Sequence, residues 1–150
     1  MKKNYAFTLI ELIIVIAILG ILSSLISGNF ITSLKKGRDT KRKNDLDQVQ
    51  KALEMYYEDN NEYPATVPFP GELCHPTGGC STQNYMFNIP QDPKTDYTYF
   101  YESSDQTYYK IYSYIENDQD EGPGVNQVGY GVSCGSDNCK FGLSSSNVKL

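Results

Sequence analysis

The distribution of apolar residues divides the chain into an apolar N-terminal segment, an amphipathic stretch and a tyrosine-rich remainder. No charged residue occurs at positions 12–34, and the first two thirds of this run are mostly aliphatic. An α-helix needs roughly 20 apolar residues, each rising 1.5 Å, to cross the ~30 Å hydrocarbon core of a bilayer. The run therefore predicts a transmembrane helix.

Beyond this run the pattern becomes that of an amphipathic helix. Four apolar residues recur at helical spacing and form one stripe, while charged residues occupy the other faces. The four are Leu46, Val49, Leu53 and Tyr56. Two asparagines and Pro64 come soon afterwards, and they predict that the helix ends near Tyr57.

The remaining residues favour loops and short strands. Residues 64–93 are rich in Pro, Gly and Asn and predict a long loop with little regular structure. Residues 97–101 and 107–115 alternate and are rich in aromatic side chains, which is typical of paired strands. Stretches near 130–132 and 140–143 are candidates for a third strand. The pattern predicts a helix packed on a small antiparallel sheet.

Charge is distributed unevenly along the chain. Lys2 and Lys3 precede the apolar run, and six basic residues follow it within positions 35–43, offset there only by Asp39. From residue 44 onward 16 Asp and Glu oppose 5 Lys and Arg. Such an acidic surface repels phosphates, so no nucleic-acid binding is expected. The basic run suits anionic lipid headgroups, a neighbouring acidic surface or a solvated helix face.

Glu11 is the one charged residue among its apolar neighbours at the start of the run. An ionised side chain at bilayer depth costs on the order of 2.5–3.5 kcal/mol, so such residues usually have a partner and a function. The run contains no cation. An amine created by cleavage just upstream, on the same copy or a neighbouring one, would supply the partner. A cleaved secretory signal ending near Ser24–Ser27 and a plain signal anchor are the alternatives.

Residues 2–12, Lys-Lys-Asn-Tyr-Ala-Phe-Thr-Leu-Ile-Glu-Leu, resemble the leader and processing site of type IV pilins and type II secretion pseudopilins. The resemblance implies that prepilin peptidase cuts between Ala6 and Phe7 and then N-methylates Phe7. It also implies that Glu11 aids assembly by pairing with the Phe7 amine of an adjacent subunit. The family usually has Gly before the cut, whereas this chain has Ala6, which is still a small residue.

The same resemblance implies an α+β, pilin-like fold, in which a long N-terminal transmembrane helix continues into a small globular head with a short antiparallel β-sheet. The expected parts are a leader (1–6), a transmembrane and assembly helix (7–34), a soluble continuation of the helix (35–59) and the head (60–150). The precursor would lie in the cytoplasmic membrane with its head outside the cytoplasm. The more numerous basic residues after the run favour the opposite topology, but a cytoplasmic-side peptidase must reach Ala6. Residues 88–93 and the tyrosine-rich strand after them resemble the corresponding junction in major pseudopilins, although this match is looser than that of the leader.

The four cysteines form two local pairs, Cys74 with Cys80 and Cys134 with Cys139. Three connectivities are possible. Disulfides are the normal state outside the cytoplasm, and local pairing is favoured. A four-cysteine zinc site is the rival, although its ligand pairs usually have two to four intervening residues. His75 adjoins a cysteine, but no third group that would orient a catalytic base is evident.

An acidic stretch at 116–121 precedes a Gly-Pro-Gly turn. Calcium prefers several oxygen ligands on a bending loop. Major pseudopilins bind calcium in a loop after a similar strand, so the resemblance makes Asn117, Asp118 and Asp120 candidate ligands. The family's second acidic cluster is missing, and only Asn126 stands there. A solvated acidic turn is the alternative; no other cofactor is expected.

The first functional hypothesis is a structural filament subunit, mature in a surface or envelope filament. Its expected partners are other copies, minor pilins or pseudopilins, prepilin peptidase, the inner-membrane assembly platform and membrane lipid. The second is a monomeric signal-anchored domain whose acidic head binds a partner outside the cytoplasm. A redox or metal enzyme would need reactive thiols or a bound metal, and no enzymatic activity is expected.

Overall fold

The structure, a computed structural model, describes residues 7–150, except for the side chains of residues 25–29. Its elements are α1 (Leu9–Asn60), β1 (Gly71–His75), β2 (Gly79–Ile89), β3 (Phe100–Glu102), β4 (Lys110–Ser113) and β5 (Phe141–Ser144). This is the α+β arrangement of a long helix and small antiparallel sheets that the sequence predicts. The chain divides into two compact units, Met1–Lys35 and Lys36–Leu150, which we describe separately. The predicted leader, residues 1–6, lies outside the described residues.

The first unit contains the N-terminal part of α1. Its described apolar side chains make no core of their own, and Ile10, Ile18 and Leu22 expose 66%, 52% and 51% of their area. Among the helical residues that the structure describes, no segment combines the length and the apolar character needed to cross a membrane.

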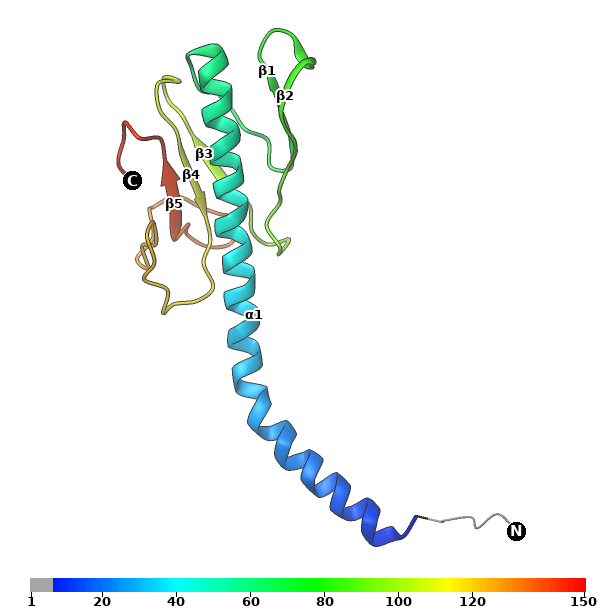
Figure 1. Cartoon of the computed structure of the whole chain (residues 1–150). Helices are drawn as coiled ribbons and strands as arrows, with labels where there is room; N and C mark the ends of the chain where they lie inside the picture. The colour runs from blue at the N-terminus through cyan, green and yellow to red at the C-terminus, as the bar shows by residue number, and fades with distance from the viewer. Residues whose placement is uncertain (1–6) are drawn as a thin grey trace, which may run out of the picture. The chain divides into compact units, whose positions relative to one another are not determined.

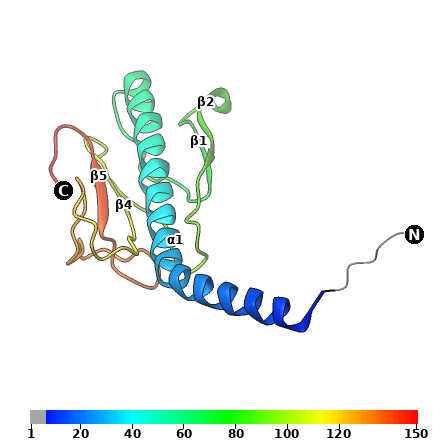
Figure 2. The ribbon, with the colours of Figure 1, turned by 60° about the horizontal axis from the view of Figure 1, so that its bottom comes forward.

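The second unit, Lys36–Leu150, forms around the C-terminal part of α1. We call this whole unit the head below; it includes part of the helix as well as the predicted head at 60–150. The predicted apolar stripe is confirmed, because its four residues expose 4% or less of their area. Both sheets contribute to the same core, with Ile111 from β4 and Ile89 from β2 among the buried residues. Within the head, α1 lies between the three-stranded sheet and the β1–β2 hairpin (Figures 1 and 2).

The three-stranded sheet is antiparallel in the order β3-β4-β5. Tyr101 pairs with Ile111, which pairs in turn with Leu143. The two predicted aromatic strands are therefore confirmed, although both are shorter than the sequence suggests. The third strand is β5, at the second of the two candidate stretches. Residues 130–132 lie outside all the strands.

The prediction of a loop at 64–93 is wrong for most of its length, because β1 and β2 form an antiparallel hairpin there. The pairing is irregular, with register shifts between successive partners. Leu73, Tyr85 and Ile89 of this hairpin enter the core and expose 4%, 8% and 1% of their area. Packing against α1 thus stabilises strands that the local composition disfavours.

The end of α1 follows from its asparagines. Asn61 adopts a left-handed conformation (φ 56°), and its N–H donates to the carbonyl of Tyr57 at 2.8 Å. The Asn60 side chain donates to the carbonyl of Tyr56 at 2.8 Å. Asparagine tolerates this conformation better than most residues do, so the helix ends close to the predicted position.

Candidate functional site

The N-terminal site begins at Phe7, which is 85% exposed, and continues into the first turn of α1. The N–H and the hydroxyl of Thr8 donate to Oε2 of Glu11 at 2.9 and 2.7 Å. The N–H of Glu11 is directed at Oγ1 of Thr8 at 3.3 Å. This is a capping box, in which the side chains of the N-cap and third residues satisfy each other's backbone N–H groups.

Glu11 therefore has a partner in its own chain that the sequence reasoning missed. The Thr-x-x-Glu spacing ahead of an apolar run is typical of a capping box and could have predicted this contact. A carboxylate beside the first turn is also stabilised by the helix dipole. The second carboxylate oxygen, Oε1, accepts no hydrogen bond from residues 7–150, so the cap leaves capacity for a further donor. Ala6, the other residue of the predicted cleavage site, lies outside the described residues.

The basic run contains a buried arginine. The guanidinium of Arg42 donates to both carboxylate oxygens of Asp92 at 2.7 and 2.8 Å. It also donates to Asp39 at 2.9 Å and to Glu116 at 2.8 Å. Its side chain has no exposed area. These contacts connect α1 with the segments before β3 and after β4.

Further charges complete this group, which we call the Arg42 cluster and define as Arg38, Asp39, Arg42, Asp92, Lys94 and Glu116. Arg38 binds both oxygens of Glu116 at 2.7 Å each, and the Lys94 ammonium lies 3.1 Å from the same carboxylate. The cluster thus has three cations and three carboxylates, which is the balance that buried charges require.

The electrostatics of the Arg42 cluster stabilise the charged forms of Glu116 and Arg42. Hydrogen bonds from Arg38, aided by Arg42, hold the pKa of Glu116 well below its ordinary value of 4.5, although burial opposes them. Burial alone would lower the pKa of Arg42, but the carboxylates of Asp92 and Glu116 outweigh it and raise that pKa. The cluster has no free acid or base for catalysis and acts as a structural junction.

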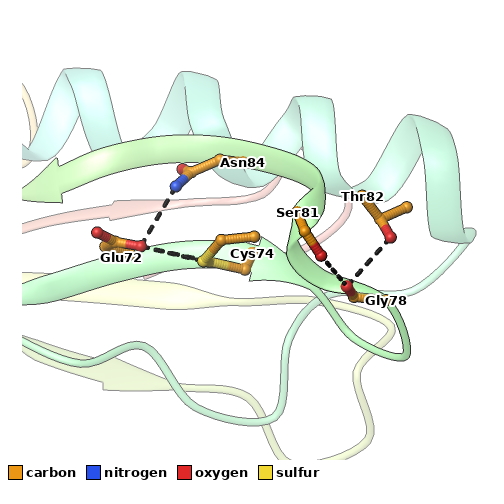
Figure 3. Close-up of a disulfide and its surroundings, with 7 residues drawn as sticks. Glu72, Cys74, Gly78, Ser81, Thr82 and Asn84 are labelled. Atoms are coloured by element: carbon orange, nitrogen blue, oxygen red, sulfur yellow. Dashed lines mark hydrogen bonds between the residues drawn. A yellow bond between two sulfur atoms is a disulfide. The ribbon is translucent and has the colours of Figure 1, made fainter.

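The cysteines are bonded in local pairs, Cys74 with Cys80 and Cys134 with Cys139, which is the connectivity that the sequence favours. Cys134 and Cys139 are completely buried. The other bond lies at the more exposed hairpin, where Oε2 of Glu72 approaches both sulfurs and the Asn84 amide (Figure 3).

Neither cysteine pair offers thiolates to a metal. Within the described part of the chain, the grouping of potential metal ligands is Glu72, Cys74 and Cys80, and both of these cysteines are oxidised. The neighbouring His75 accepts N–H groups from Thr77 and Gly78 at 3.3 and 3.2 Å, so its Nδ1 stabilises the hairpin turn.

The candidate calcium ligands lie on one loop, but their oxygens already have hydrogen-bond donors from the protein. The Lys43 ammonium lies 2.7 Å from Oδ2 of Asp120, and the Lys140 ammonium lies 2.7 Å from Oδ1 of Asp118. Oδ1 of Asn117 accepts the N–H of Gln119 at 3.4 Å.

Asn126 does not extend the set, since its amide bonds within its own turn, to Gly129 and Val128. Calcium requires six to eight free oxygens at 2.3–2.6 Å. The residues present therefore do not fit a calcium site.

Comparison with known proteins defines the class. Residues 1–27 match the prokaryotic N-terminal methylation motif. The motif precedes a long helix that continues into a head with small antiparallel sheets. This combination defines a pilin-like protein. Residues 29–129, more than half of the chain, match the family described as type II secretion system (T2SS), protein G. The chain belongs to this family.

Individual relatives agree with this assignment. The chain is 36% identical over 98 residues to the type II secretion system core protein G of Aeromonas hydrophila, covering 61% of this chain and 68% of the relative. It is 38% identical over 102 residues to the core protein G of Pectobacterium carotovorum subsp. carotovorum, covering 63% and 65%. For the Klebsiella pneumoniae protein the identity is 36% over 104 residues, covering 62% and 71%. The match to the Pectobacterium protein thus spans slightly less than two thirds of that relative. No solved structure matches the chain significantly.

Membership of this family establishes the broad function. The chain is a pseudopilin, a structural subunit of a filament, and it is not an enzyme. The resemblance seen in the leader is thereby confirmed, and the pseudopilin alternative is favoured over the pilus alternative.

Proposed function

We infer that this chain is made as a membrane-anchored precursor, loses residues 1–6 and polymerises through the N-terminal part of α1 into a type II secretion pseudopilus. The observation that carries this proposal is the exposed apolar surface of the helix. Phe7, Leu9 and Ile10 expose 85%, 76% and 66% of their area, and aliphatic residues continue the surface along the helix. An apolar surface of this extent needs lipid or protein against it.

Processing is proposed between Ala6 and Phe7, followed by N-methylation of Phe7. The match of residues 1–27 to the N-terminal methylation motif supports it. The exposure of Phe7, just before the helix begins at Leu9, also supports it, because a peptidase needs an extended and accessible substrate. The cut would create a new amine only one residue from Thr8.

Assembly is proposed to use Glu11 as an acceptor for the Phe7 amine of an adjacent copy. Thr8 already orients this carboxylate through Oε2. A second donor brought by a neighbouring copy would neutralise its charge within the apolar surroundings of packed helices, where an unpaired charge is costly. Register between subunits then depends on one ion pair, while affinity comes from apolar packing.

The proposed location follows from this assembly route. Residues 7–34 would be held in the cytoplasmic membrane before assembly, with the head outside the cytoplasm, where its two disulfides are stable. The expected partners are other copies, minor pseudopilins, prepilin peptidase, the assembly platform and lipid. No cofactor enters the proposal, and calcium binding at Asn117, Asp118 and Asp120 is a prediction that the contacts of that loop do not favour.

Two variants of the N-terminal site test the proposal. Glu11→Val removes the carboxylate, and with it the acceptor and one half of the capping box, whereas the matched control Thr8→Val removes the hydroxyl half of the box and keeps the carboxylate. We expect Glu11→Val to insert and mature normally, as judged by mature mass, but to lower filament yield by roughly tenfold or more. Thr8→Val should assemble at close to the wild-type yield.

Other results would contradict specific parts of the proposal. Equal losses in the two variants would show that Glu11 acts only as a helix cap. A wild-type yield from Glu11→Val would refute the pairing. A purified native protein that still begins at Met1 would refute the processing.

A further inference from the structure

The loop 117–127 is closed by an amide at the point where two of its carbonyls converge. Nε2 of Gln127 donates to the carbonyl of Asn117 at 3.1 Å and to the carbonyl of Asp120 at 2.7 Å. The carbonyl of Asn117 also accepts the N–H of Asp120 at 3.1 Å. Oxygens that converge in this way repel one another unless a donor or a cation lies between them. Here the side-chain amide is the donor.

Two acidic side chains of the same loop, Asp118 and Asp120, are paired with cations from outside it. Lys43 reaches Asp120 from α1, and its ammonium lies 5.5 Å from the ring centroid of Phe141. Lys140, just before β5, binds Asp118. The N–H of Gly122 also donates to Oδ1 of Asp120, at 3.0 Å. The carboxylate of Asp120 is therefore balanced by a cation that belongs to the chain itself.

We propose that Lys43 and Gln127 replace a divalent cation in this loop, so that the head folds independently of calcium. The resemblance places a calcium ion in the corresponding loop of major pseudopilins, where oxygens would surround it. In this chain the amide and the ammonium supply the positive electrostatic potential instead. Lys43 and Gln127 are part of the chain and cannot dissociate from it, so the loop stays ordered when the calcium concentration is low. The inference concerns the head alone and does not depend on filament assembly.

The test is thermal unfolding of the full chain in detergent, followed by circular dichroism, with EDTA or with millimolar calcium chloride. The wild-type Tm should be the same in both. Gln127→Glu replaces the donor by a third oxygen at the point of convergence. We expect its Tm in EDTA to fall by roughly 2–8 °C and to recover at least partly with calcium. Lys43→Met should also lower the Tm, because it leaves Asp120 without its cation.

A matched control separates this contact from a general effect of charge. Gln119→Glu makes the same chemical change on an exposed side chain of the same loop, and it should alter neither the Tm nor the calcium response. The proposal is overturned if wild-type Tm rises with calcium and falls with EDTA. It is also overturned if Gln127→Glu unfolds like the wild type in EDTA, because the amide would then not hold the loop. Filament yield is a separate measurement, so failure here leaves the proposed function untouched.

Discussion

Replacing Arg42 by Met is the most informative change in the head. Methionine replaces the aliphatic stem of arginine and keeps much of its apolar packing, but it removes the four hydrogen bonds that Arg42 donates to Asp39, Asp92 and Glu116. Arg38 and Lys94 still neutralise Glu116 in this variant. Asp92 loses its bidentate partner, and its side chain has no exposed area.

The magnitude follows from two opposing effects. Hydrogen bonds to charged groups contribute about 1.5–3 kcal/mol each, so the four bonds of Arg42 would total about 6–12 kcal/mol. Part of this loss is regained, because the variant no longer buries a guanidinium. Removing one partner of a buried ion pair costs about 3–5 kcal/mol in measured cases. We therefore expect a loss of about 3–5 kcal/mol, equivalent to a fall in Tm of roughly 6–20 °C for a chain of this size.

Urea and thermal unfolding of the full chain in detergent, followed by circular dichroism, measure this loss. Lys41→Met is the matched control, because Lys41 is a basic residue on the same helix whose side chain is exposed. It should change the free energy of unfolding by less than about 0.5 kcal/mol. The double variant Arg42→Met with Asp92→Asn should recover part of the loss, since it removes the buried carboxylate that has lost its guanidinium.

A small effect would refute this reasoning. If Arg42→Met lies within about 1 kcal/mol of the wild type, the cluster behaves like an exposed set of ion pairs. If the double variant is no more stable than the single one, the cost does not come from an uncompensated carboxylate.

Three further predictions concern pH, redox chemistry and processing. The pKa of Glu116 is lower in the folded state than its ordinary 4.5, so its contribution to stability is complete above that pH and is lost as the pH falls below it. Glu116→Gln should therefore flatten the dependence of the unfolding free energy on pH in this acidic range. An unchanged slope would contradict the prediction. A mild dithiol should reduce the exposed Cys74–Cys80 bond before the buried Cys134–Cys139 bond, since thiolate attack needs access to the sulfur. Alkylation followed by peptide mass spectrometry gives the order of reduction, and the reverse order would disprove the reasoning. Ala6→Asp should block leader removal and leave precursor in the membrane, and immunoblots that show efficient maturation would count against the assigned cut.

The hairpin β1–β2 shows a limit of local sequence patterns. Its composition of Pro, Gly and Asn predicts a loop, and its register is interrupted by several shifts. The strands exist because Leu73 and Ile89 reach the same core as the helix stripe. Contacts between residues far apart in the chain decide this outcome, and a short window of sequence does not contain them.

The basic run 35–43 shows a second limit. Its six basic residues have equal formal charge, yet Lys41 is exposed and Arg42 is completely buried. One signal was available, because Arg42 precedes Leu46, Val49 and Leu53 at helical spacing and therefore lies on the apolar face. Which acids would meet it there was not predictable, since Asp92 and Glu116 are 50 and 74 residues away.

The sequence alone determined the features that depend on local chemistry. The leader motif, the uncharged run with Glu11 at its start, the apolar stripe and the local cysteine pairs are each specified by neighbouring residues or by helical spacing. The tertiary structure decided which charges are buried together and what neutralises the acidic loop. Lys43 and Lys140 meet that loop only after α1 and the sheet have packed. Long-range electrostatic partners depend on chain topology, and one-dimensional spacing does not encode it.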